Sequence, residues 1–153
     1  MSSVMQRQST NRPIENDRNP RRPISPTAYV LMVQGIYYLA TGIWPLVSID
    51  TFQMVTGPKT DLWLVDTVGV LIAVIAVVLL VAAWRRQTIG EVILLAVGSA
   101  LALIGIDVIF VAQKVIPRIY LLDAAAEGAL VIAWIAALII EARTLWKRSD
   151  SCL

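Results

Sequence analysis

Histidine is absent from this 153-residue chain, and cysteine occurs once, at Cys152. Without histidine, haem cannot be held by histidine side chains, as it usually is in membrane b-type cytochromes, and zinc sites that use histidine are excluded as well. One cysteine excludes thiol–disulfide membrane oxidoreductases, which need pairs. A prenylation signal needs cysteine fourth from the end, and Cys152 does not stand there. We therefore expect no cofactor and no metal.

Long apolar runs are what the chain has instead. Hydrophobic residues make up 58% of it, against roughly 45 to 50% in a soluble domain. Four runs, at about 28–48, 62–84, 90–112 and 119–141, each reach the roughly 20 residues that a membrane-spanning helix needs. The sequence therefore predicts an all-α polytopic membrane protein, with a four-transmembrane-helix bundle over residues 28–146.

The basic residues predict the orientation of this bundle. Residues 1–27 carry five arginines among Ser, Asn, Gln and Pro, which is typical of a disordered tail, and residues 147–153 form a second, short tail. Ten of the 13 basic residues lie in the two tails, at the end of the last helix or between the second and third runs. Lys59, Lys114 and Arg118 lie on the other side. The positive-inside rule then places both termini in the cytoplasm.

The first apolar run has no acid, which argues against the small four-helix drug antiporters, whose first helix carries an essential glutamate. The other three runs contain Asp66, Asp107, Asp123 and Glu127, all near the predicted outer face. A charge at a helix centre costs roughly 2.5 to 3.5 kcal/mol on insertion scales, so such residues usually mark a functional site or a paired network.

Spacing predicts which way these acids point. In the last run Asp123, Glu127, Trp134 and Glu141 form one stripe, with Glu127 the deepest acid. Asp107 lies on the side of two alanines, Ala96 and Ala100.

Small residues add a second pattern. Asp66 shares a side with Gly69, Ala73 and Ala76, which allow close helix approach, so we expect Asp66 to point into the bundle. Further small-residue seams follow Gly98, Ala102 and Gly105 in the third run and Ala125, Ala129, Ala133 and Ala137 in the fourth.

The resulting hypothesis is an acidic cavity open to the outer face, for a cation, a protonated amine or a polar lipid head group. Its candidate residues are Glu127, Asp123, Asp107 and Asp66, with Gln34, Tyr38 and Thr41 at the floor. The competing interpretation is an internal salt-bridge network, in which the same acids pair with Lys59, Lys114 and Arg118.

Two segments carry a resemblance. Residues 57–65, GPKTDLWLV, followed by Thr67-Val68-Gly69, and residues 120–124, YLLDA, resemble uncharacterised small four-helix membrane proteins of bacteria. In helix count and size the chain is also loosely similar to DoxX-like families and to the EXPERA domain. That similarity implies intramembrane acids around a lipid-like ligand.

We therefore expect a multi-pass protein of a bacterial inner membrane that binds a small ligand or lipid and is not an enzyme. One alternative is a lipid-modifying enzyme or a cation- or proton-coupled carrier using Glu127 and Asp123. Another is a structural accessory subunit, since small-residue seams can dock a second copy or a larger membrane complex. The basic tail favours anionic lipid head groups as partners, and nothing points to nucleic acid.

Overall fold

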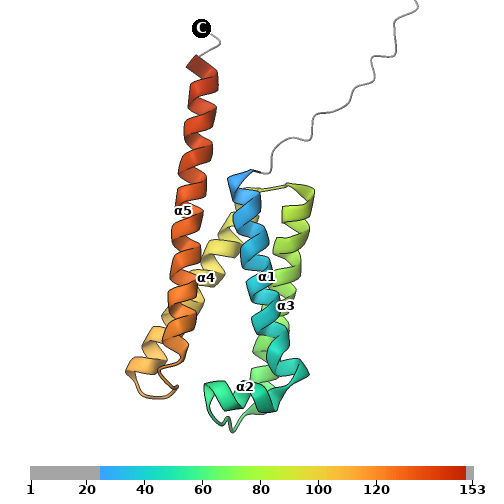
Figure 1. The fold of residues 1–153 in the computed structure, drawn as a ribbon, viewed down its shortest axis with the longest axis vertical. Helices are drawn as coiled ribbons and strands as arrows, with labels where there is room; N and C mark the ends of the chain where they lie inside the picture. Colours follow the sequence, from blue (N-terminus) through green and yellow to red (C-terminus); the bar gives the residue numbers. More distant parts are fainter. Residues whose placement is uncertain (1–24, 151–153) are drawn as a thin grey trace, which may run out of the picture.

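The computed structural model describes residues 25–150, and this part of the chain is all-helical (Figure 1). Its helices are α1 (Pro26–Val47), α2 (Ile49–Thr56), α3 (Leu62–Arg85), α4 (Gly90–Ala112) and α5 (Tyr120–Asp150). Four of them, α1, α3, α4 and α5, are long and apolar enough to cross a membrane. The prediction of an all-α fold with four apolar helices is confirmed, and these helices suggest a multi-pass membrane protein. The predicted N-terminal tail, up to residue 24, and Cys152 lie outside the described residues.

Two helical features differ from the prediction. The short helix α2 was not expected; Trp44 holds it beside the end of α1, because its indole nitrogen donates to Thr51 Oγ at 3.0 Å and its ring meets Phe52 edge-on. The last helix extends to Asp150 instead of ending near residue 141. No glycine or proline follows residue 141 to end it, and a change from apolar to polar residues does not by itself stop a helix.

Local signals set the bounds of α1. Ser25 caps its start, where the side-chain oxygen accepts from the Ala28 backbone N–H at 3.2 Å, and Pro26 follows in the first turn, where a missing N–H costs nothing. Near the other end, Pro45 lies inside the helix, which stops two residues later.

The helices associate as two pairs, α1 with α3 and α4 with α5, and α1 also contacts α5 (Figure 1). Gly42 and Gly69 bring α1 and α3 together: a Cβ atom on Gly42 would lie 2.8 Å from the Gly69 carbonyl oxygen, and one on Gly69 would lie 2.7 Å from that of Gly42. The two backbones therefore touch. By contrast, a Cβ atom on Gly98 or Gly105 would meet nothing within 4 Å, so the predicted seam on α4 is not covered by any part of the chain that the structure describes.

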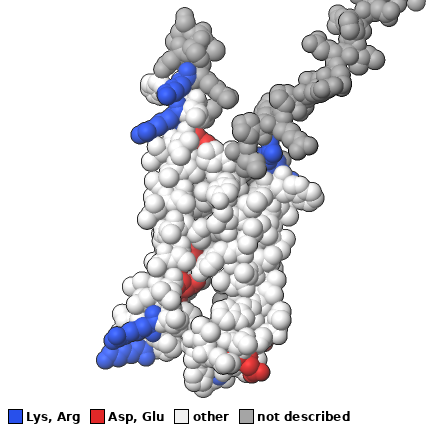
Figure 2. Space-filling model, in the orientation of Figure 1, with Lys and Arg blue, Asp and Glu red and all other residues white. Residues whose placement is uncertain are grey.

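The buried core lies where the pairs meet, and includes Leu31 and Tyr38 of α1, Leu79 of α3 and Trp134 of α5. Basic side chains on the face in Figure 2 gather at the two ends of the molecule, and most of the surface between them carries no charged side chain. In the same view, acidic side chains are visible in the hollow between α5 and the α1–α3 pair.

Candidate ligand site

Glu127 lies at the centre of the candidate site. It projects from α5 into the bundle and is fully buried, with 0% of its surface exposed. Its Oε2 accepts a hydrogen bond from the Tyr38 hydroxyl at 3.0 Å, but its Oε1 has no hydrogen-bond partner within residues 25–150. Half of this carboxyl group is therefore unsatisfied in a place that the rest of the chain shields completely.

Asp123 lies one turn before Glu127 on α5, on the same face. It accepts a hydrogen bond from the Tyr37 hydroxyl through Oδ1. Two consecutive tyrosines of α1, Tyr37 and Tyr38, thus reach two successive acids of α5. The phenol groups supply two hydrogen-bond donors but no positive charge.

Asp107 completes the acidic group from a third helix, α4. It is 5% exposed, on the same side of α4 as the buried Ala96 and Ala100, and its Oδ2 also has no partner within the described residues. Its carboxyl group interacts with that of Asp123, and both also act electrostatically on Glu127. The structure therefore brings together three of the four acids predicted to form the site.

Asp66 does not join them, and the prediction that it points into the bundle is wrong. Its side chain is exposed on α3. Helical spacing does align Asp66 with Gly69, but Gly69 already lies beside Pro45 and Leu46, in the last turn of α1. Asp66, one turn nearer the start of α3, is not covered by this contact and stays exposed.

Two of the three polar residues predicted for the floor make their hydrogen bonds to groups outside the acidic cluster. Gln34 is fully buried; its amide donates to the Ala96 carbonyl oxygen at 2.8 Å and accepts from the Trp134 indole nitrogen at 2.8 Å. Thr41 donates to the Tyr37 carbonyl of its own helix at 2.9 Å. Of the three floor residues, only Tyr38 contacts an acid of the cluster.

The three predicted pairing bases do not reach the cluster. The Lys59 ammonium lies 3.4 Å from the Thr56 carbonyl oxygen and 4.7 Å from the centre of the Tyr120 ring. Lys114 and Arg118 are exposed, and Lys114 has a left-handed backbone (φ 60°) just after α4. Over residues 25–150, no ion pair joins Asp107, Asp123 or Glu127 to any of these bases.

Sequence reasoning missed two members of the site, Tyr37 and Ser99. Ser99 Oγ lies 3.3 Å from the Tyr38 hydroxyl and donates to the Ala96 carbonyl oxygen at 3.1 Å. A tyrosine or serine in an apolar run is compatible with many environments. The only available signal was that Tyr37 directly precedes Tyr38.

Chemically, the cluster offers carboxyl oxygens in a largely buried setting, with phenol donors on one side and no cation. The part of the chain that the structure describes contains no group of three Asp, Glu, His or Cys side chains arranged to hold a metal ion. Such a site can accept hydrogen bonds from a proton donor or from a cation that carries N–H groups.

Comparison of the chain with known protein families, with curated proteins and with solved structures finds no match.

Proposed function

We propose that this chain is a non-enzymatic integral membrane protein that binds a protonated amine at Asp107, Asp123 and Glu127. The observation that supports this most directly is the pair of buried, unpartnered carboxylate oxygens, Glu127 Oε1 and Asp107 Oδ2. A buried charge without a partner is strongly unfavourable, so intramembrane acids are normally paired. Within the described residues, no basic side chain pairs with these acids. An ammonium group would supply both the positive charge and the missing hydrogen-bond donors.

We further propose that the site opens away from the cytoplasm of a bacterial inner membrane. The support is the asymmetry of the basic residues, ten of which lie on the side of the two termini. The acids lie toward the opposite end, where α2 and the α4–α5 connection are found (Figure 1).

The direct test is a ligand-induced shift in thermal stability, measured on protein in phosphatidylcholine nanodiscs with primary amines. Wild type should be stabilised, whereas Glu127→Gln should bind roughly 10- to 150-fold more weakly, because a hydrogen bond to a charged group contributes roughly 1.5 to 3 kcal/mol. Gln keeps an oxygen that can accept from Tyr38, so the fold should survive.

Asp66→Asn is the matched control, because it removes an acid from an apolar helix outside the cluster. This variant should respond to amines like wild type. If Glu127→Gln and Asp66→Asn lost amine binding equally, or if amines did not stabilise wild type, the proposal would be contradicted.

A proton- or cation-coupled carrier is the second candidate. The observation in its favour is that three side-chain hydrogen bonds cross between α1 and α5, where the two helix pairs meet: Tyr37 with Asp123, Tyr38 with Glu127, and Gln34 with Trp134. Amine uptake into proteoliposomes that requires a proton gradient and is lost in Glu127→Gln would favour the carrier. Amine binding without uptake would instead support a protein that binds the amine and does not transport it.

A further inference from the structure

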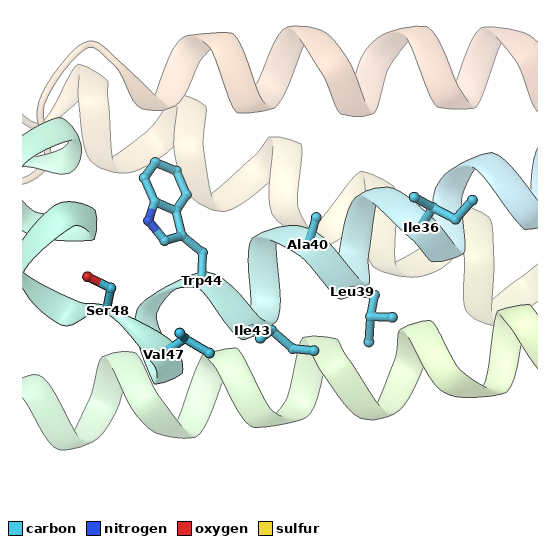
Figure 3. A pocket seen from close by; sticks show the side chains of 7 residues that line it. All are labelled: Ile36, Leu39, Ala40, Ile43, Trp44, Val47 and Ser48. Atoms are coloured by element: carbon cyan, nitrogen blue, oxygen red, sulfur yellow. The ribbon is translucent and has the colours of Figure 1, made fainter.

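An apolar groove of about 470 Å³ runs along α1 (Figure 3). The residues that matter here are Ile36, Ala40, Ile43, Trp44 and Val47. This volume falls within the roughly 300 to 1,000 Å³ usual for small-molecule sites. The side chain of Val47 is 78% exposed and that of Ile36 is 57% exposed, so the groove opens on the outside of the helix bundle.

The groove passes beside Tyr37, which follows the lining residue Ile36 in the sequence. Tyr37 lies three and seven residues before Ala40 and Trp44, and these spacings put the three residues on one face of α1. In Figure 3, Trp44 points toward the side on which α4 and α5 lie. The Tyr37 hydroxyl on that face is the group that contacts Asp123.

The other end of the groove lies at α2. Ser48, between α1 and α2, lines it, and the Trp44 ring is held there by Thr51 and Phe52. The apolar groove therefore runs along the last three turns of α1, from Ile36, next to Tyr37, to the end of the helix.

We propose that the ligand is an amphiphilic amine whose ammonium N–H groups donate to Glu127 and Asp107 and whose apolar tail lies in the groove toward α2. This inference rests on the proposed function for its head group and adds the tail. Because the groove is open to the bilayer, such a molecule could enter sideways from the lipid. The unpartnered oxygens are acceptors, so they favour an amine with N–H groups over a quaternary ammonium.

Trp44 allows the tail to be located directly. We would add a long-chain primary amine, brominated near the end of its tail, to protein in phosphatidylcholine nanodiscs and record tryptophan fluorescence. Bromine quenches a nearby indole, so wild type should show a saturable quench, and Trp44→Phe should lose that component. The brominated alcohol of equal length, which partitions into the bilayer but carries no charge, should give only weak, non-saturating quenching.

Two further variants separate the head group from the tail. Ala40→Leu fills the groove at an exposed position and should weaken saturable quenching about tenfold while short amines still stabilise the protein. Glu127→Gln should weaken both responses, and Asp66→Asn neither.

The outcomes distinguish the two proposals. If amines stabilise wild type but the saturable quench persists in Trp44→Phe and in Ala40→Leu, the tail lies elsewhere, and this inference fails while the proposed function stands. If amine and alcohol quench alike and Glu127→Gln changes nothing, the cluster does not bind amines, and both proposals fail. A trimethylammonium analogue that binds as well as the primary amine would overturn the role given to the N–H donors.

Discussion

Gln34 and Glu127 are both fully buried polar residues, but they differ in how far their hydrogen bonds are completed. Gln34 donates to the Ala96 carbonyl and accepts from the Trp134 indole, so it links α1, α4 and α5. Glu127 has one oxygen bonded and one without a partner in the described chain. A satisfied buried group stabilises a fold, whereas an unsatisfied one calls for an explanation. We therefore assign Gln34 to the fold and keep Glu127 as a residue of the proposed ligand site.

Replacing Gln34 should accordingly cost stability and leave amine binding intact in the folded protein. Gln34→Leu leaves the buried Trp134 N–H without an acceptor, at about 1 to 3 kcal/mol for an unsatisfied group. The Ala96 carbonyl loses one donor but keeps the Ser99 hydroxyl. Reversible unfolding in mixed detergent micelles would measure the loss. Thr41→Val is the control, because Thr41 Oγ bonds only within α1, to the Tyr37 and Tyr38 carbonyls, and its loss should have little effect. Equal losses in the two variants would contradict this assignment.

Single residues also show where sequence reasoning about the site stops. Glu127, Asp107 and Asp123 could be identified because an acid in an apolar run is costly wherever it points. Tyr37 could not, because a tyrosine in such a run fits lipid, core or interface equally well. The pairing of Lys59, Lys114 and Arg118 with the acids depended on loop geometry, which charge counting does not supply.

At the level of helices, the closest packing is between α1 and α3, where Gly42 and Gly69 bring the two backbones into contact. Neither position has room for a side chain, because the nearest atoms are backbone atoms of the opposing helix. In a membrane, where lipid is as apolar as a side chain, such close contact is a main source of helix association.

Gly69→Leu should therefore separate α1 from α3 and destabilise the protein by about 1 to 3 kcal/mol or more, as overpacking does in other cores. Gly98→Leu is the matched control: it makes the same change in a helix of similar length, but a Cβ atom there meets nothing within 4 Å. Its stability in detergent should match wild type or rise slightly, since glycine inside a helix is unfavourable by roughly 0.5 to 1 kcal/mol. If Gly98→Leu proved as damaging as Gly69→Leu, the seam on α4 would have to be covered by another molecule.

The helices also show how much of the fold the sequence contained. The four apolar helices follow from run length, because a bilayer sets the minimum length of a span. The eight-residue helix α2 carries no such signal, since its stability comes from contacts with Trp44. Small-residue spacing indicated the packing face of α3 at Gly69, but it could not show that Asp66, one turn earlier on the same helix, remains exposed.

In the molecule as a whole, the two ends of the contact between the helix pairs are built differently. At the start of α1, Thr27 is 1% exposed, and its hydroxyl lies 2.7 Å from Glu141 Oε1 on α5 and 3.3 Å from the Thr88 hydroxyl between α3 and α4. Glu141 also accepts the Thr27 backbone N–H at 3.3 Å, at a helix start where a carboxylate is favoured. At this end, hydrogen bonds of Thr27 join α1 to α5 and to the α3–α4 connection. The acidic cluster toward the α2 end instead contains two carboxyl oxygens without a partner in the described residues.

Thr27→Val should therefore loosen the helix contacts at the start of α1 without disturbing the ligand site. The change removes the hydroxyl that joins α1 to α5 and to the α3–α4 connection. It leaves the partly buried Glu141 carboxylate with the Thr27 backbone N–H as its donor from α1. Hydrogen exchange of the amides at the start of α1 and around Thr88 should become about tenfold faster, as loss of one hydrogen bond to a charged group implies, while amides near Tyr38 stay protected. Thr144→Val is the control, because that hydroxyl bonds only to the Glu141 carbonyl of its own helix. If exchange at the start of α1 were the same in Thr27→Val as in wild type, the Thr27–Glu141 contact would not hold the helix pairs together, and closure of this end would have to come from apolar packing alone.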